Sequence, residues 1–277
     1  NKNENLICKS LLSLLSPIAE LINTSQKNIQ SYQKTSVTDL VTDVDIGIEL
    51  ILRLWFQRHL PTHIIIGEEA KKPSIKTSDI IWYIDPIDGT TNYVNQTQDF
   101  CINIGSTKNG KPFINIIYHP PSKSFFYSTP TQTNYTHFIY NNKKICTEYL
   151  PHRKNEDILF HYIQKEYQLS SFQSKAIGIS LLKMIEGEFS YFYKPLAKPW
   201  DVIAGAGILA SNPYWDIILL TKTNAIISPF SNDTEFVNKL NHYYQNNCRF
   251  GSLIITPKQN KSIQTFIINQ LKPLQVL

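Results

Sequence analysis

One stretch of the sequence constrains this chain more than any other: residues 80–95, IIWYIDPIDGTTNYVN, where a strand-forming apolar run ends in two aspartates. Asp85 and Asp88 stand three residues apart, and carboxylates that lie close together raise each other's pKa unless a cation lies between them. Gly89 lets the backbone approach a ligand closely, and the two threonines after it can open a helical turn whose free N–H groups favour an anion. The stretch therefore indicates a cation site beside an anion-binding turn.

Other acidic residues also stand where apolar runs end or helices begin: Asp45, Glu68, Glu69 and Asp201. Each alone is an ordinary cap, and Glu69 is interpreted as one. Together with the aspartate pair they form an all-oxygen donor set, which is typical of Mg²⁺ shared between carboxylates and a substrate phosphate. Metal carboxylates, an anion-binding turn and the Thr90 hydroxyl are the components of metal-assisted hydrolysis of a phosphate ester.

Composition and missing motifs exclude several other classes of function. The 277 residues carry 27 basic and 22 acidic side chains with no block of like charge, which favours a solvated surface over a nucleic-acid footprint. Four widely spaced cysteines form no CxxC pair, which argues against a disulfide framework or a zinc site and fits a reducing cytoplasm. The sequence contains neither the GxxxxGK[ST] loop of nucleotide hydrolases nor the GxSxG of serine hydrolases.

The first two helices are predicted from apolar spacing. No apolar run approaches the length of a membrane span, and the N-terminal spacing indicates an amphipathic helix rather than a signal peptide. The residues that repeat at helical spacing there are Leu11, Leu15, Ile18 and Ile22. A second helix is expected from Asp45 to His59, with a broad apolar face made of Ile46, Leu50 and Leu54 together with Ile48, Ile51 and Trp55.

Patterning along the rest of the chain predicts an α+β protein with two lobes, residues 1–145 and 146–277. Strand-like runs separated by tight turns indicate a largely antiparallel sheet in the first half, whereas strands and helices alternate in the second. Strands are expected near 62–69, 79–88, 100–107, 112–120, 124–130, 189–194, 216–220, 224–228 and 252–257, and helices near 174–187, 200–211 and 260–271.

Four motifs resemble those of the inositol monophosphatase family, and their order and spacing agree from about residue 30 to residue 210. The stretch DPIDGTTN at residues 85–92 looks like the family signature. Gly67-Glu68-Glu69 resembles its GEE motif, and Trp200-Asp201 followed by VIAGAG resembles its WD helix. Upstream, Lys34 and the DLVTDVD at residues 39–45 match the family's K…DLVTxxD segment.

The resemblance implies a layered αβαβα sandwich and a Mg²⁺-dependent, often lithium-sensitive, phosphomonoesterase with two or three ions. Carried over by position, the first ion would be held by Glu68, Asp85 and the Ile87 carbonyl, and the second by Asp85, Asp88 and Asp201. A third, weaker ion would be served by Glu68 and Asp45.

The same resemblance implies the other roles at the site. The attacking water would be oriented by Thr90 with the help of Asp45 or Glu68. The N–H groups of Gly89 and Thr90 would bind the phosphate, and Asp88 would also reach a substrate hydroxyl. Lys34 would lie near the metal-bound waters.

Three positions depart from the family pattern. Seven residues before the WD aspartate, where the family carries a Glu that binds sugar hydroxyls, this chain has Lys194. Two interpretations stay open: an exposed lysine in a variable loop, or a cation for a second anionic group on the substrate. The segment 211–214, SNPY, replaces the EAGG turn of the family. The Gly-Ser that is usual before the preceding helix is missing, and the segment 175–179, KAIGI, fits the pattern poorly, which leaves that part of the substrate pocket unassigned.

The expected substrate is a small phosphorylated metabolite, first of all inositol monophosphate or a related polyol or sugar phosphate. The alternatives are fructose 1,6-bisphosphate, a 3′(2′),5′-bisphosphate nucleotide and histidinol phosphate. A different class of function is a catalytically weak, metal-binding regulatory relative, although such a relic is expected to lose at least one acidic ligand. No nucleic acid or membrane partner is expected, and the dimers common in the family allow a homodimer.

Overall fold

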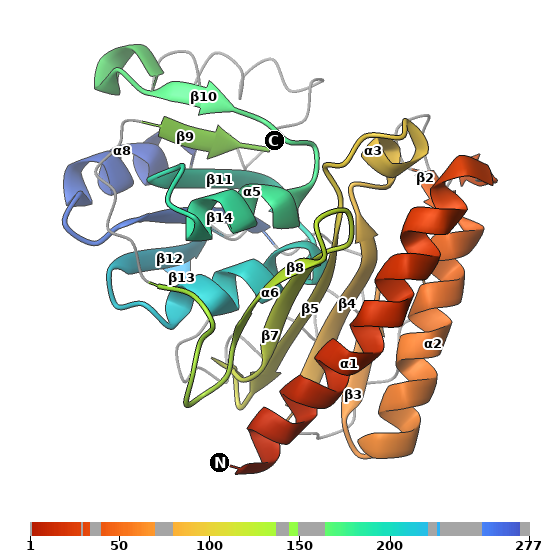
Figure 1. Cartoon of the computed structure of the whole chain (residues 1–277). Coiled ribbons are helices and arrows are strands. Elements are labelled where there is room, and N and C mark those ends of the chain that lie inside the picture. Colours follow the sequence, from red (N-terminus) through yellow and green to blue (C-terminus); the bar gives the residue numbers. More distant parts are fainter. Residues whose placement is uncertain are drawn as a thin grey trace.

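The structure is a computed structural model, and it describes residues 2–28, 30–33, 40–69, 80–136, 144–148, 164–220, 226–227 and 251–271. Two six-stranded sheets and three layers of helices alternate in it (Figure 1). This is the layered α+β sandwich that the sequence predicts. The helices are α1 (Lys2–Ser25), α2 (Asp43–His59), α3 (Thr90–Val94), α5 (Ile177–Ile185), α6 (Pro199–Ala210) and α8 (Lys261–Leu271), with a 3₁₀ turn at Gln26–Asn28.

The first sheet has the strand order β3-β4-β5-β7-β8, with the short β6 beside β5. Its strands are antiparallel neighbours except for β3, which runs parallel to β4. This confirms the largely antiparallel first half. The strands are β3 (Ile64–Gly67), β4 (Ile80–Asp88), β5 (Cys101–Lys108), β6 (Lys111–Pro112), β7 (Asn115–His119) and β8 (Ser124–Ser128); β1 (Ser31–Gln33) and β2 (Leu40–Thr42) form a separate pair.

The second sheet has the order β10-β9-β11-β14-β12-β13. Its strands are β9 (Lys144–Thr147), β10 (Ser170–Phe172), β11 (Tyr191–Ala197), β12 (Trp215–Leu220), β13 (Ile226–Ile227) and β14 (Gly251–Pro257). β9 belongs wholly to this sheet, yet it lies across the proposed boundary between residues 145 and 146. The division into lobes 1–145 and 146–277 stays a prediction.

Three hydrophobic cores lie between the layers. Helices α1 and α2 cover one face of the first sheet, and α5 and α6 lie between the two sheets (Figure 1). Along β4, Trp82 and Ile84 pack under α1 and α2, whereas Ile81 and Tyr83 pack into the middle layer. Burial on both faces is why this strand reads as an unbroken apolar run. The third core joins the outer face of the second sheet to α8.

Small residues let α6 lie close to its neighbours. A Cβ added to Gly105 of β5 would come within 2.6 Å of the Ala204 backbone nitrogen. On another side of the helix, a Cβ on Gly205 would meet Leu181 of α5 at 2.6 Å. The run VIAGAG therefore sets how closely α6 packs, and this packing places the N-terminal end of the helix against the first sheet.

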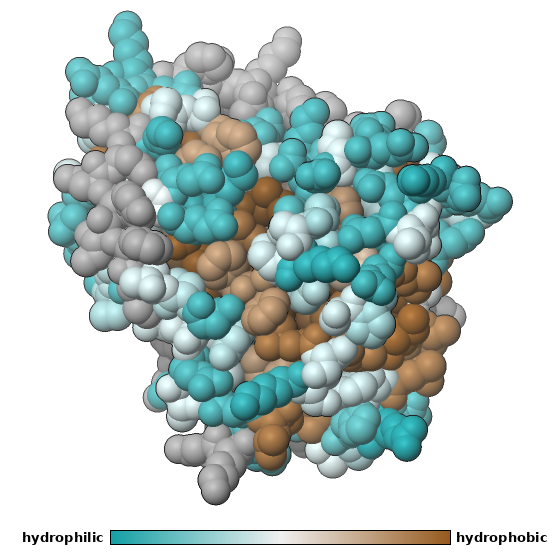
Figure 2. Space-filling view, viewed as in Figure 1, coloured by the Kyte–Doolittle hydropathy of each residue, from teal (hydrophilic) through white to brown (hydrophobic). Residues whose placement is uncertain are grey.

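The predicted face of α1 is confirmed, and that of α2 is partly wrong. Leu11, Leu15, Ile18 and Ile22 of α1 are all buried. In α2 the buried positions are Asp45, Ile48, Glu49, Leu52 and Phe56. The predicted row of Ile46, Leu50 and Leu54 is instead 50%, 56% and 55% exposed. The helix buries a different stripe because Glu49 and Asp45 turn toward the sheet, and apolar side chains gather on the surface where α1 and α2 lie (Figure 2).

The expectation that no segment approaches the length of a membrane span needs correction. Within the described residues, the helical segment Asn3–Asn28 is long and apolar enough to cross a membrane by length and composition. One third of its most apolar window, 33%, is buried inside the protein. A core helix of a soluble protein or a signal sequence meets the same criterion, and the buried side of α1 packs against the first sheet.

Candidate active site

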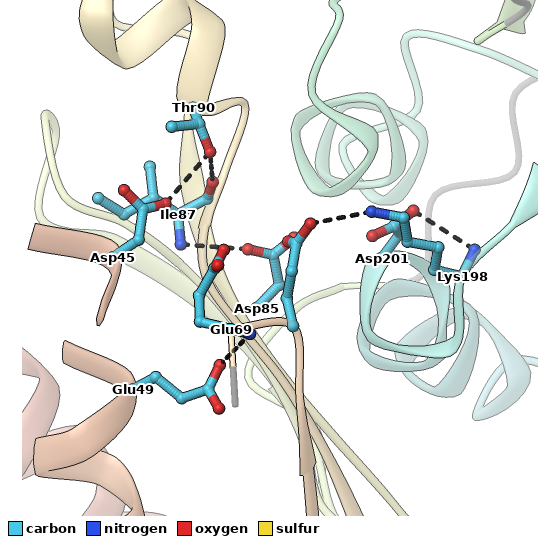
Figure 3. A network of polar contacts seen from close by, with 9 residues as sticks. Asp45, Glu49, Glu69, Asp85, Ile87, Thr90, Lys198 and Asp201 are labelled. Atoms are coloured by element: carbon cyan, nitrogen blue, oxygen red, sulfur yellow. Dashed lines mark hydrogen bonds and ion pairs between the residues drawn. The ribbon is translucent and has the colours of Figure 1, made fainter. Parts of the chain in front are cut away.

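Three carboxylates converge where the two sheets meet α6. Glu68 follows β3, Asp85 lies in β4, and Asp201 lies in the first turn of α6. One oxygen of each lies within 4.8 Å of the others, and Asp85 and Asp201 are labelled in Figure 3. The parallel pairing of β3 with β4 brings residues 68 and 85 to the same edge, and the Glu68 N–H donates to the Ile84 carbonyl at 3.2 Å.

Asp45 and Thr90 face this group from the side of α2. The Thr90 hydroxyl lies 3.2 Å from Asp45 Oδ1 and 3.0 Å from the Ile87 carbonyl oxygen (Figure 3). Asp45 is held by a capping box at the start of α2, in which its carboxylate accepts the Thr42 N–H at 3.0 Å. A capping box thus fixes a side chain that also reaches the hydroxyl proposed to act on water.

Asp88, the last residue of β4, is held from the opposite side. Its carboxylate accepts the Ile177 N–H at 3.1 Å, the Gly178 N–H, and the Asn103 side-chain amide at 3.1 Å. Ile177 and Gly178 are the first residues of α5. A helix start in the second half of the chain therefore orients an aspartate of the first half, in the region that the sequence left unassigned.

Burial raises the pKa of the four aspartates gathered here. The pKa of Asp45 rises to about 6, that of Asp201 to about 6 and that of Asp88 to about 7. The pKa of Asp85 is raised well above its ordinary value, first by burial and then by the charges of its acidic neighbours. Carboxylates in this state gain stability from a nearby cation, and an all-oxygen donor set suits a hard one such as Mg²⁺. The residues therefore fit the ion that the sequence predicts.

The turn at Gly89 follows directly after Asp88, the last residue of β4. Gly89 adopts a left-handed φ of 91°, and an added Cβ there would come within 2.8 Å of both the Ala176 Cβ and the Asp99 carbonyl oxygen. Helix α3 begins at the next residue, Thr90. The predicted turn is therefore present, in a conformation that glycine adopts without strain.

Two lysines lie beside the acidic group. Lys194 is on β11 and is not exposed, so the interpretation as an exposed lysine in a variable loop is wrong. Burial lowers its pKa, while the charges of Asp201, Glu148 and Asp88 raise it. Lys198, which the sequence analysis missed, places Nζ 2.9 Å from Glu68 Oε1 (Figure 3). Its place three residues before Asp201 was the signal that could have found it.

Two more residues support the site without having been predicted. Glu49 of α2 is 2% exposed, and its carboxylate accepts the Glu69 N–H at 2.7 Å and the Arg53 Nε–H at 2.8 Å. It thereby anchors the loop that carries Glu68. Glu148, after β9, organises the turn before α5. A single acidic residue in a largely apolar stretch, IGIELIL for Glu49 and ICTEYL for Glu148, was the signal at both positions.

The remaining predicted positions are Lys34 and the segment 211–214. Lys34 lies outside the described residues. The segment after α6 forms a turn, in which the Ser211 hydroxyl donates to the Ile208 carbonyl and the Asn212 side chain accepts the Tyr214 N–H at 2.9 Å. This turn connects α6 to β12, as expected of a structural element.

Comparison with known proteins decides the family. Residues 9–211, well over half of the chain, match the inositol monophosphatase family. The chain belongs to the inositol monophosphatase family. Members of this family are phosphatases that hydrolyse phosphomonoesters, and they depend on metal ions.

Individual relatives are similar in sequence to this chain over most of its length. The inositol-1-monophosphatase of Bacillus subtilis is 26% identical over 205 residues, which are 69% of this chain and 77% of the relative. The Nus factor SuhB of Vibrio cholerae is 25% identical over 240 residues, 81% of this chain and 84% of the relative.

Solved structures show the same fold. Staphylococcal inositol monophosphatase-1, in an inhibitory complex soaked with LiCl, has a TM-score of 0.75 at 22% identity and covers 98% of this chain and 96% of its own. An IMPase/NADP phosphatase complexed with NADP and Ca²⁺ also has a TM-score of 0.75 at 22% identity, with 96% of each chain covered.

Proposed function

We propose that this family member is a Mg²⁺-dependent phosphomonoesterase of a small phosphorylated polyol or sugar, with inositol monophosphate as its first candidate substrate. The observation that carries the proposal is the convergence of Glu68, Asp85 and Asp201, with oxygens within 4.8 Å of one another. The Thr90–Asp45 contact beside them supplies a hydroxyl for orienting water. A cytoplasmic location, lithium sensitivity and a homodimer stay predictions.

The ligand sets stay as the sequence predicts them; among the described residues, the acids that bring oxygens within 4.8 Å of one another are Glu68, Asp85 and Asp201, without Asp88 or Asp45. Glu68, Asp85 and the Ile87 carbonyl would hold one Mg²⁺, and Asp85, Asp88 and Asp201 a second. Asp45 and Glu68 would serve a third. Oδ2 of Asp88 accepts both the Gly178 N–H and the Asn103 amide, which use its two lone pairs. Oδ1 accepts the Ile177 N–H and keeps a second lone pair for a cation.

In the proposed reaction, bound Mg²⁺ would neutralise the phosphate, favour departure of the alcohol oxygen and lower the pKa of a water. The chain's own residues would do the positioning. The Thr90 hydroxyl, which contacts Asp45 and the Ile87 carbonyl, would hold the water in line with the phosphorus. The Gly89–Thr90 turn would bind the phosphate oxygens through backbone N–H groups.

The direct test is phosphate release from an aryl phosphate and a panel of natural esters, measured with Mg²⁺ and with excess chelator. Turnover with Mg²⁺ and its loss with chelator are expected. A catalytically weak regulatory relative would show no metal-dependent turnover on any ester. That result would contradict the proposal that the protein is an enzyme. Titration with Li⁺ in the same assay tests the predicted inhibition.

For the substrate, we propose that Lys194 favours an ester with a second anionic group. The charges of Asp88 and Asp201 act on its ammonium group. The family has a Glu at the position of Lys194. Lys194→Glu is expected to reduce the ratio of kcat/KM for a sugar bisphosphate over inositol monophosphate by about 10-fold or more, equal to about 1.4 kcal/mol. Lys194→Met, which keeps the buried stem without charge, should fall in between. An unchanged ratio in Lys194→Glu contradicts this assignment.

The raised pKa values also predict how pH and Mg²⁺ act on stability. The folded-state pKa values of Asp45, Asp88 and Asp201 lie above those of the unfolded chain, so the metal-free protein binds more protons than the unfolded chain between about pH 4 and 7. That contribution to stability is present at low pH and is lost as pH rises through about 7. Bound Mg²⁺ offsets the loss by stabilising the ionised carboxylates.

The expected result is therefore a larger increase in Tm on adding Mg²⁺ at pH 8 than at pH 5, by about 5 °C or more. Thermal melts with Mg²⁺ and with EDTA, at matched ionic strength, measure it. A Na⁺ series at the same ionic strength is the control for general screening. A Mg²⁺ effect that is constant or shrinks toward pH 8 would show that these carboxylates do not bind the ion.

A further inference from the structure

Glu148 is a buried acid whose carboxylate is surrounded by hydrogen-bond donors. It follows β9 and is 3% exposed. Its Oε1 accepts the Ser174 N–H at 2.8 Å, the Ser174 hydroxyl at 2.9 Å and the Ser180 hydroxyl at 2.6 Å, and its Oε2 accepts the Lys175 N–H at 3.2 Å. Such a group of donors is the usual way to satisfy a buried carboxylate, and it fixes the atoms that donate.

The donors from Ser174 and Lys175 belong to the turn that opens α5, and the Ser180 hydroxyl lies within the helix itself. Lys175 has a left-handed φ of 63°, a conformation that is strained for a residue with a side chain. Helix α5 also lacks a side-chain cap at Ala176. Instead, the Ser174 hydroxyl accepts the Ala176 N–H at 3.0 Å, and the hydroxyls of Ser174 and Ser180 lie 2.7 Å apart. Glu148 thus supplies contacts that hold the strained turn before the helix, whose first two N–H groups donate to Asp88.

This turn contacts the proposed catalytic residues of the first half of the chain. The first two N–H groups of α5, at Ile177 and Gly178, donate to the Asp88 carboxylate. The Asn92 side chain of α3 donates to the Ser174 carbonyl at 3.0 Å. Ala176 also lies against Gly89, where an added Cβ would meet the Ala176 Cβ at 2.8 Å. The position of the turn therefore decides where the Asp88 carboxylate and the Gly89 backbone lie.

Strand pairing places Glu148 to act on this face. β9 runs parallel to β11, with Ile145, Cys146 and Thr147 opposite Tyr191, Phe192 and Tyr193. The Glu148 N–H donates to the Tyr193 carbonyl at 3.0 Å, which continues the pairing by one step. Cys146 and Phe192 both face the middle layer, so the alternation along the strands directs Glu148 to the same layer as α5.

We propose that Glu148 is a positioning residue for the metal and phosphate site. By holding the turn at residues 174–176, it aims the first N–H groups of α5 at Asp88 and seats Ala176 on Gly89. The inference rests on the proposed function, because Asp88 is there a ligand of the second Mg²⁺. In this role Glu148 would act through the turn, without contacting the ion or the substrate.

The test is Glu148→Gln, studied by Mg²⁺ binding calorimetry in the presence of inorganic phosphate and by kinetics. Glutamine keeps the length of the side chain but turns one acceptor into a donor, which faces a serine hydroxyl or a backbone N–H. The expected result is Mg²⁺ affinity about 10-fold weaker and kcat lower by about 10-fold, with KM for substrate at saturating Mg²⁺ changed less than 3-fold. Glu188→Gln, at an exposed acid beyond the same helix, is the matched control and should leave all three unchanged.

A double-mutant cycle on the Mg²⁺ affinity distinguishes the proposed positioning role of Glu148 from a purely structural role. If Glu148 acts through Asp88, Glu148→Gln should weaken Mg²⁺ binding much less in an Asp88→Asn background than in the wild type. Equal effects in both backgrounds, or a lower Tm with unchanged Mg²⁺ affinity, would overturn the proposal. If Glu148→Gln does not fold, Ser180→Ala removes one of its donors and should weaken Mg²⁺ binding about 3-fold; an unchanged affinity there counts against it as well.

The two proposals fail differently. Wild-type protein that neither binds Mg²⁺ nor hydrolyses any phosphate ester overturns the proposed function and this inference with it. Wild-type protein that does both, beside a Glu148→Gln variant that behaves identically, overturns only the role of Glu148.

Discussion

Asp201→Asn is expected to lower kcat/KM for a phosphomonoester by about three orders of magnitude or more, equal to at least about 4 kcal/mol of transition-state stabilisation. Asp201 is one of three acids whose oxygens lie within 4.8 Å, and it is the only one of the three contributed by the second half of the chain. Asparagine keeps the shape but removes the negative charge that a Mg²⁺ ligand of this site needs. The measurement is kcat/KM over a Mg²⁺ titration.

The same variant should be at least as stable as the wild type when metal is absent. The charge of Asp201 raises the pKa of both Asp85 and Asp88, so its removal relieves repulsion in the EDTA-treated protein. Asparagine can still accept the Lys198 N–H at the start of α6. Loss of activity with an unchanged or higher Tm in EDTA therefore separates lost chemistry from lost folding.

Asp216→Asn is the matched control for this substitution. Asp216 lies on β12, where it contacts Lys261 at 3.4 Å and Gln264 at 3.0 Å, and it takes no part in the proposed site. Its variant should keep near-normal kcat/KM. Near-normal turnover by Asp201→Asn would contradict the ligand assignment.

Thr90→Ala is expected to lower kcat by about 10²–10³-fold with little change in Mg²⁺ affinity. The hydroxyl bridges Asp45 Oδ1 and the Ile87 carbonyl oxygen, and alanine leaves both without that donor. In the proposed reaction the same hydroxyl holds the attacking water, so the loss falls on the chemical step. Single-turnover rates at saturating Mg²⁺ and substrate measure it.

Thr90→Ser provides the matched comparison. Serine keeps the hydroxyl and loses only a methyl group, so its kcat should stay within about 10-fold of the wild type. If serine and alanine lower kcat equally, the hydroxyl is not the group that orients water. Equal rates for alanine and the wild type would lead to the same conclusion.

Much of the fold followed from the pattern of the sequence. The strand that ends at Asp88, the short helix that begins at Thr90 and the small-residue helix after Trp200 all lie where their residues predicted. These predictions succeeded because each depends on local features: an apolar run, a glycine with positive φ, and a helix start marked by proline and aspartate.

The face of α2 could not be predicted in the same way. Ile46, Leu50 and Leu54 have the spacing of a buried row, yet the helix buries the stripe that contains Asp45 and Glu49. The helix buries these two acids instead of the three apolar residues because Asp45 contacts Thr90 and Glu49 holds the loop of Glu68. Both contacts join residues 20 to 45 positions apart, and helical periodicity carries no information about them.

Motif order and spacing in the sequence were thus enough to predict the family, the reaction class and the acidic residues proposed to bind Mg²⁺. The tertiary structure decided how those residues meet: Asp201 beside Glu68 and Asp85, Lys194 on a buried strand beside the acids, and Glu148 beneath the turn that holds Asp88. Local patterns encode strands, turns and helix starts. The meeting of residues 68, 85 and 201, and the contact of Glu148 with the turn before α5, depend instead on how two sheets and the helices between them pack.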